Sequence, residues 1–140
     1  MAVKQLSVFV SNQPGSMVKI TQSLRDAKVD IRALAVADTQ DFGIIHFIPS
    51  DHDKAKSVLL ENHCLVSDDT VVGVVMPDTP GGLTDVLTYL SEEKINIEYL
   101  YAFLIPQKGK ACVVLRVSEP HEVDQLLLAR GFELIDDHLE

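Results

Sequence analysis

Hydrophobic residues recur along this chain first at strand spacing and then at helix spacing. Residues 6–10 and 71–76 are rich in β-branched and aromatic side chains, which favour strands. A Pro-Gly dipeptide follows each segment, and apolar residues then recur every three or four positions, as they do on one face of a helix. These helical positions are Met17, Ile20, Leu24 and Ala27 in the first segment, and Leu83, Val86 and Leu90 in the second.

Each predicted helix is followed by two strands, a second helix and a short last strand. The second helices are expected to start near Ser50, with Asp53 completing a capping box, and near Ser118, which precedes a proline. They are expected to end near residues 62 and 130. The predicted strands are 31–37, 43–48 and 65–66 in the first half, and 97–104, 111–117 and 133–135 in the second.

The two halves are an internal repeat. Asn12-Gln13-Pro14-Gly15 aligns with Asp78-Thr79-Pro80-Gly81 at an offset of 66 residues. After residues 38–41 the offset becomes 68, and Asp68-Asp69 then aligns with Asp136-Asp137. The two extra residues fall in a loop between strands, where an insertion costs little. We therefore expect two domains, residues 1–67 and residues 68–140.

The order strand, helix, strand, strand, helix, strand occurs twice and predicts an α+β protein. Each repeat is expected to be a ferredoxin-like βαββαβ unit, an antiparallel sheet with both helices on one face. A unit of this size buries little surface alone, so the repeats should associate. We expect residues 31–37 to lie beside residues 97–103, joining the edges into one eight-stranded sheet.

The strands are apolar on both faces, although helices can cover only one. Ile45 and Phe47 alternate with Ile44, His46 and Ile48. A second sheet packed on the free face would bury this pattern, which predicts a homodimer. The alternative is a monomer with one face partly exposed.

Composition and charge exclude several classes of protein. The chain has 140 residues, of which 46% are hydrophobic and 24% charged, as in ordinary globular proteins. The formal net charge of −9 arises entirely in residues 68–140 and disfavours nucleic acid and anionic membranes as partners. No apolar run is long enough to span a membrane, and the first eleven residues lack a signal-peptide pattern. Cys64 and Cys112 lie in apolar stretches and indicate buried thiols in the cytoplasm.

Catalytic chemistry has little support in the sequence. His46 lies within a predicted strand, and His52 and His121 fall in the first turns of predicted helices. The His63-Cys64 pair has no further ligand at zinc spacing, and the Asp136-Asp137-His138 segment is typical of a solvated end. No serine-hydrolase, phosphate-loop, metalloprotease or dinucleotide-binding motif occurs. We therefore predict no catalytic residue, metal or cofactor.

The two Pro-Gly turns are the candidate binding elements. Glycine allows a sharp turn, and the first amide groups of the following helix lack backbone partners. Such amides suit a carboxylate, and the side-chain oxygens of Asn12 and Asp78 could accept hydrogen bonds from an ammonium group. Together these features match a free amino acid. The alternative interpretation is that each turn is only a helix cap.

These motifs resemble the ACT domain, a small regulatory module of amino-acid metabolism. The match covers Asn12–Met17 with Asp30-Ile31 and, more closely, Asp78–Leu83 with Asn96-Ile97, so the chain resembles two ACT repeats in tandem. The resemblance implies that an amino acid binds between the turn of one repeat and the edge strand of the other. One implied site contains Asn12, Gln13, Gly15, Ser16 and Met17 with Asn96 and Ile97; the other contains Asp78, Thr79, Gly81, Gly82 and Leu83 with Asp30 and Ile31.

Three functions remain open on these grounds. The resemblance favours a regulatory protein that senses a free amino acid and signals to a partner enzyme of amino-acid metabolism. A small enzyme that uses His46 or a carboxylate in a pocket between subunits is one alternative. The other is an assembly subunit that binds no ligand. Because an acidic side chain binds an ammonium group more strongly than an amide does, we expect the Asp78 turn to hold its ligand more tightly than the Asn12 turn.

Overall fold

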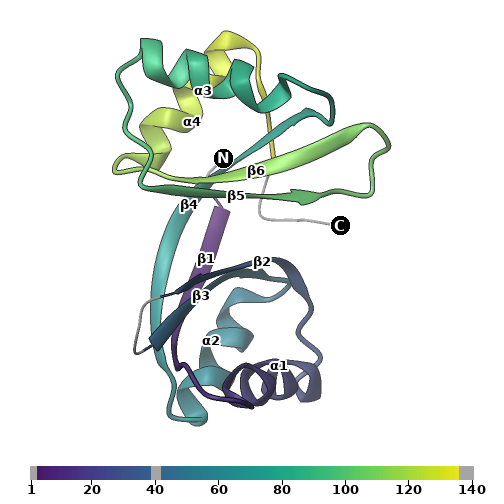
Figure 1. The fold of residues 1–140 in the computed structure, drawn as a ribbon, viewed down its shortest axis with the longest axis vertical. Coiled ribbons are helices and arrows are strands. Elements are labelled where there is room, and N and C mark those ends of the chain that lie inside the picture. Colours follow the sequence, from purple (N-terminus) through teal and green to yellow (C-terminus); the bar gives the residue numbers. More distant parts are fainter. Residues whose placement is uncertain (1–2, 39–41, 136–140) are drawn as a thin grey trace. The chain divides into compact units, whose positions relative to one another are not determined.

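The computed structural model describes residues 3–38 and 42–135. The aspartates at 136 and 137, His138 and most of the predicted turn at 38–41 lie outside these residues. The described elements, drawn in Figure 1, are β1 (Val3–Ser11), α1 (Ser16–Asp26), β2 (Ile31–Asp38), β3 (Phe42–Pro49), α2 (His52–Glu61), β4 (Leu65–Pro77), α3 (Gly82–Glu92), β5 (Tyr99–Leu104), β6 (Lys110–Arg116), α4 (Pro120–Arg130) and β7 (Glu133–Leu134).

The chain divides into two compact units, residues 4–69 and residues 70–140 with 1–3. In the first unit the strand order is β2-β3-β1-β4, and in the second it is β5-β6-β4-β7. In each unit both helices cover one face of an antiparallel sheet (Figure 1). The predicted ferredoxin-like βαββαβ repeats are therefore confirmed.

The strand count differs from the prediction in one respect. β4 is a single strand of 13 residues that closes the first unit and opens the second, so seven strands are described instead of eight. Residues 66–71 contain no Gly or Pro that would break an extended chain. β2 pairs only with β3 and β5 pairs only with β6 among the described strands, so both are edge strands, and the pairing of residues 31–37 with 97–103 stays a prediction.

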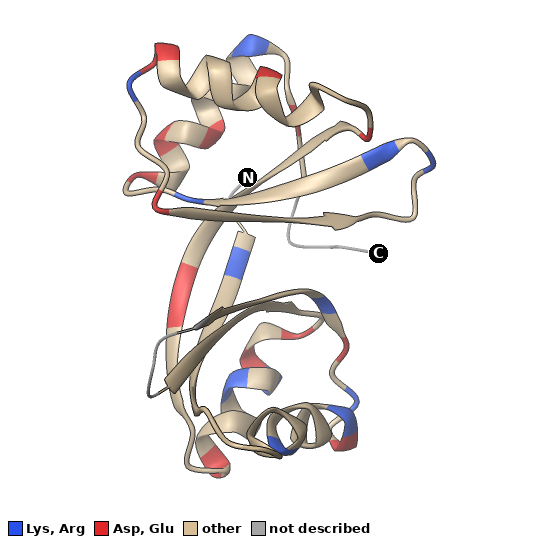
Figure 2. Ribbon diagram, viewed as in Figure 1, with Lys and Arg blue, Asp and Glu red and all other residues tan. Residues whose placement is uncertain are grey.

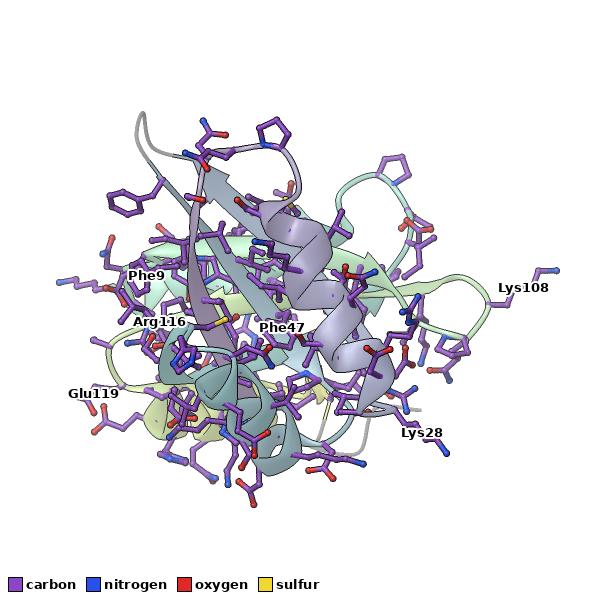
Figure 3. All side chains as sticks on the ribbon, turned by 90° about the horizontal axis from the view of Figure 1, so that it is seen from below. Phe9, Lys28, Phe47, Lys108, Arg116 and Glu119 are labelled. Carbon is purple, nitrogen blue, oxygen red and sulfur yellow. The ribbon has the colours of Figure 1, made fainter. Side chains whose placement is uncertain are left out.

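Each unit has its own hydrophobic core between sheet and helices. In the first unit, Ile20 and Leu24 of α1 and Leu59 of α2 pack against strand residues that include Phe47, which Figure 3 labels. In the second unit, Val86 and Leu90 of α3 belong to the corresponding core. The helical spacing seen in the sequence therefore marks the buried face of each helix.

The start of α2 corrects the predicted capping box. Asp51 is the N-cap, and its side chain accepts a hydrogen bond of 3.1 Å from the Lys54 N–H. Ser50 instead pairs with Asp30: its Oγ accepts from the Asp30 N–H at 2.9 Å, and its N–H donates to the Asp30 carbonyl at 2.8 Å. Aspartate caps helices as well as serine does, so the neighbouring residue took this role. In α4 the N-cap is Glu119, one residue after Ser118.

Candidate functional site

Both Pro-Gly turns end in a glycine with a left-handed backbone, a conformation that favours glycine over other residues. Gly15 (φ 87°) precedes α1 and Gly81 (φ 92°) precedes α3. The turns close in the same way, because the Ser16 N–H donates to the Gln13 carbonyl at 3.2 Å and the Gly82 N–H donates to the Thr79 carbonyl at 3.0 Å. The two turns therefore share one backbone design.

The amide groups just inside each helix are open. No partner among the described residues accepts from the N–H groups of Met17 and Val18 in α1, or of Leu83 and Thr84 in α3. Neither helix has a side-chain cap. Unpaired N–H groups at the positive end of a helix attract an anionic oxygen.

Asn12 and Asp78 do not act as helix caps. Both residues are exposed, and neither side chain has a hydrogen-bond partner among the described residues. The backbone N–H of Asp78 donates to the Gly109 carbonyl at 2.9 Å, which fixes this turn against the loop between β5 and β6. The N-caps are the turn glycines Gly15 and Gly81, so the side chains of Asn12 and Asp78 remain available to a ligand. The alternative interpretation, that each turn only caps its helix, stays a prediction.

The two turns differ at their first helical residue. In the first unit, Ser16 Oγ lies 2.8 Å from Ser11 Oγ. In the second unit, Gly82 is buried, and a Cβ atom at this position would lie 2.3 Å from the Pro77 carbonyl oxygen. Because it has no side chain, Gly82 allows Pro77 to pack closely against the helix start, whereas Ser16 offers a hydroxyl group there.

The predicted strand-start residues lie at the opposite end of each helix from the turn. Asp30 and Ile31 follow the end of α1, and Asn96 and Ile97 follow the end of α3. Each of these helices has 11 residues, and at 1.5 Å per residue a helix of this length spans about 16 Å. A single amino acid cannot bridge that distance, so no unit brings its own turn and its own strand start together.

The two strand starts also differ in their backbone hydrogen bonds. Ser50 occupies both the N–H and the carbonyl of Asp30. The backbone groups of Asn96 and Ile97 have no partner among the described residues, because β5 begins only at Tyr99. The sequence offers no sign of this difference, since Ser118 aligns with Ser50.

His46 belongs to a polar cluster on the sheet face opposite the helices. Ser7 Oγ lies 2.8 Å from His46 Nδ1 and donates a hydrogen bond of 2.5 Å to Asp69 Oδ2, which Gln5 Nε2 also contacts at 3.3 Å. The single hydroxyl proton of Ser7 points to the carboxylate, so His46 Nδ1 is the donor to Ser7. In a nucleophilic triad the imidazole lies between the carboxylate and the hydroxyl, and this order is different. The geometry does not activate Ser7, which is buried.

The remaining candidate groups offer no further chemistry. Both cysteines are free, and burial raises the pKa of the Cys64 thiol and raises that of Cys112 to about 12. Within residues 3–38 and 42–135, no three His, Cys, Asp or Glu side chains gather in a way that could hold a metal ion. No helix in this part of the chain is long and apolar enough to cross a membrane.

Two ferredoxin-like repeats with matching open helix ends define a class of small paired-domain proteins, and comparison with known proteins identifies the family. A family model described as an ACT domain pair matches residues 1–139. The chain therefore belongs to the ACT domain family, as a pair of ACT domains.

Solved structures agree with this assignment. Protein BT0572 from Bacteroides thetaiotaomicron is 38% identical, with a TM-score of 0.90 over 96% of this chain and 92% of that chain. The regulatory subunit of aspartate kinase from Thermus thermophilus is 13% identical, with a TM-score of 0.61 over 91% and 92% of the two chains. The aspartokinase alpha and beta subunits give 18% identity and a TM-score of 0.61, with 90% of each chain covered. The last two likenesses concern the fold alone. A search of curated proteins found no match.

Proposed function

We propose that this ACT domain pair is a regulatory protein that binds a free amino acid at its Pro-Gly turns. The observation that carries the proposal is the repeated arrangement of two open helix amides beside an exposed, uncommitted Asx side chain. The amides of Met17 and Val18, or of Leu83 and Thr84, would bind the carboxylate. Asn12 or Asp78 would accept hydrogen bonds from the ammonium group.

The rest of each site would come from a strand start of the other repeat. Asn96 and Ile97 would complete the site at the Asn12 turn, and their unoccupied backbone groups support this role. Asp30 and Ile31 would complete the site at the Asp78 turn. There the backbone of Asp30 is already occupied by Ser50, so the Asp30 side chain or Ile31 would contact the ligand.

We propose a homodimer that signals to a partner enzyme of amino-acid metabolism. Phe9 and Phe42 support the dimer: they lie on the sheet face opposite the helices, their ring centroids are 6.2 Å apart, and they are 40% and 43% exposed. Ligand binding would alter the surface offered to the enzyme only if one arrangement of the repeats binds the amino acid better than another. Sedimentation of the Phe42→Lys variant would test the dimer, and an unchanged dimer would refute the role of this face.

A regulatory role also fits the polar cluster better than a catalytic role does, because Ser7 is buried and its proton is directed at Asp69. The enzyme alternative would rest on His46 or a carboxylate, with no activated serine beside it.

A thermal-shift screen against the twenty common amino acids tests the proposal. A ligand that binds only the folded state stabilises it by about 2.7 kcal/mol at a hundredfold excess over Kd. We expect one or two amino acids to raise Tm, and the rise to disappear in the Asn12→Ala/Asp78→Ala double variant. The Asp53→Ala variant, on an exposed position of α2, serves as a control. If no amino acid raises Tm, the proposal is refuted and the result favours the assembly-subunit alternative.

A further inference from the structure

An open groove of about 590 Å³ lies in the first unit, away from the strand starts. It separates α1 from the corner where α2 leads into β4. Its walls come from the end of β1, from α1 and from the corner at residues 62–65, and include Lys19, Ile20, Ser23, Asp26, His63 and Leu65. Its volume is that of a small-molecule site.

The second repeat explains why the groove exists, because large side chains fill the equivalent space. Tyr89 aligns with Ser23, and Phe132 aligns with Cys64. The Tyr89 and Phe132 rings lie 5.7 Å apart, the Tyr89 hydroxyl donates to the Leu126 carbonyl at 3.0 Å, and the Arg130 guanidinium lies 5.0 Å from the Tyr89 ring centroid. Two small residues in the first repeat leave this volume empty.

The groove also differs in charge from the equivalent region of the second repeat. Lys19 aligns with Asp85, and no ion-pair partner of Lys19 exists among the described residues. Figure 2 shows the same contrast between the helices: α1 carries both basic and acidic residues, whereas the charged residues of α3 are all acidic. A lysine with no ion-pair partner among the described residues therefore lines the groove, where the second repeat has an aspartate.

His63 is a second residue that distinguishes the groove from the second repeat. Its backbone has a φ of 61°, and the aligned residue in the second repeat is Gly131, with a φ of 97°. Both residues follow the end of a helix, where a left-handed backbone is common. The first repeat therefore has an imidazole at a corner where the second repeat has no side chain.

We propose that this groove binds a small organic carboxylate. The Lys19 ammonium and the His63 imidazole would hold the carboxylate, and Ile20 and Leu65 would contact the apolar part of the ligand. Asp26 also lines the groove. Its negative charge offsets part of the positive charge of the walls, which disfavours the double negative charge of a phosphate monoester. This site is independent of the amino-acid sites, with which it shares only Ser16.

Benzoate is a suitable probe, titrated into the full-length protein while amide NMR signals are recorded. We expect shifts at Lys19, Ser23 and Cys64. The Lys19→Asp variant, which carries the residue of the second repeat, should weaken binding about tenfold or more, as should replacing benzoate by neutral benzamide. The Ser23→Tyr variant should fill the groove and abolish binding, and Lys19→Asp provides the test if that variant fails to fold.

Several outcomes would overturn the proposal. Benzoate shifts that avoid the groove, or equal affinity of the wild type and Lys19→Asp, would refute the site. Tighter binding of phenyl phosphate than of benzoate would refute the carboxylate class. The Asn12→Ala/Asp78→Ala variant should bind benzoate normally, so a failure of the amino-acid proposal and a failure of this one are distinguishable.

Alkylation gives an independent readout, because Cys64 lines the groove whereas Cys112 is fully buried. Iodoacetamide should modify Cys64 first in the native protein, and saturating benzoate should slow that reaction. Modification at an unchanged rate would contradict occupation of the groove.

Discussion

In the first repeat α1 faces the corner at residues 62–65 across an open groove, whereas in the second repeat Tyr89 of α3 packs against Phe132 in the equivalent space. The backbone elements around these two regions correspond one to one. Divergence has therefore changed the side chains that fill the fold while the fold itself stayed the same. One copy of a duplicated unit can therefore gain stability by filling a region with large side chains. The other copy can leave the same region open.

The Pro-Gly turns, in contrast, are alike in the two repeats. Gly15 and Gly81 keep nearly the same φ, and each helix leaves two amide groups open. The positive φ at both N-cap positions favours glycine, so the absence of a side-chain cap follows from the shape of the turn that both repeats keep.

The largest change in stability is expected from removing a side chain that fills the second repeat in the region equivalent to the groove. Tyr89→Ala removes a ring that is 7% exposed, together with its contacts to Phe132 and Arg130. We expect a loss of about 3 kcal/mol in the free energy of unfolding, measured by urea denaturation. The aligned Ser23→Ala variant should change it by less than about 0.5 kcal/mol. Equal losses would mean that the two regions are not packed differently.

A smaller loss should follow from giving the second repeat the serine of the first. In Gly82→Ser the new Cβ would meet the Pro77 carbonyl oxygen, and backbone cannot move as easily as a side chain. We expect a loss of about 2 kcal/mol by the same measurement. The reverse exchange, Ser16→Gly, should cost only about 0.5 kcal/mol through helix propensity. A neutral Gly82→Ser variant would show that the turns are interchangeable.

Much of the fold could be predicted because the repeat doubles every local signal. The aligned Pro-Gly dipeptides and the recurring apolar positions located α1 and α3, and the change of offset from 66 to 68 matches the longer loop between β5 and β6. The continuous β4 differs from the predicted boundary between residues 67 and 68. The polar residues at this boundary do not interrupt an extended chain, because neither Gly nor Pro occurs among residues 66–71.

The candidate sites were less accessible to sequence reasoning. Asn12 and Asp78 could be selected from their motif, but the Ser50 contacts that occupy Asp30 depend on two segments meeting in space. The sequence signal of the groove is the alignment of the small residues Ser23 and Cys64 with Tyr89 and Phe132. Paired small-for-large differences between repeats indicate a cavity only when the two positions are known to face each other.

The two turns are expected to differ in their affinity for an amino acid. This difference should be smaller than the difference in stability between the filled region of the second repeat and the open groove of the first. Hydrogen bonds to a charged group contribute about 1.5–3 kcal/mol, against about 1 kcal/mol for neutral ones. We therefore expect Asp78→Ala to weaken its site about tenfold more than Asn12→Ala weakens the other, as measured by calorimetry with the amino acid found in the screen. Equal losses would remove the predicted inequality between the sites.

The smallest effect concerns an ion-pair cluster of the first repeat. Asp68 lies 2.6 Å from His52 Nε2 and also pairs with Lys56, whereas the residues aligned with His52 and Lys56 are Pro120 and Asp124. The hydrogen bond from Lys56, followed by that from His52, lowers the pKa of Asp68 below its usual value of 3.8. A lowered pKa in the folded state stabilises the protein above the pKa of the unfolded state, and this stability is lost as the pH falls through the folded value.

Asp68→Asn should therefore destabilise the protein by about 0.2–1 kcal/mol at neutral pH, because the carboxyl group is 44% exposed and solvent screens the pair. The difference from the wild type should shrink below about pH 4 and vanish when Asp68 is protonated. Urea denaturation at a series of pH values measures it, with Glu61→Gln as a control that removes one exposed acidic charge from the end of α2. If both variants follow the same pH dependence, the effect belongs to the net charge of the protein, and the Lys56–Asp68–His52 cluster does not distinguish the repeats.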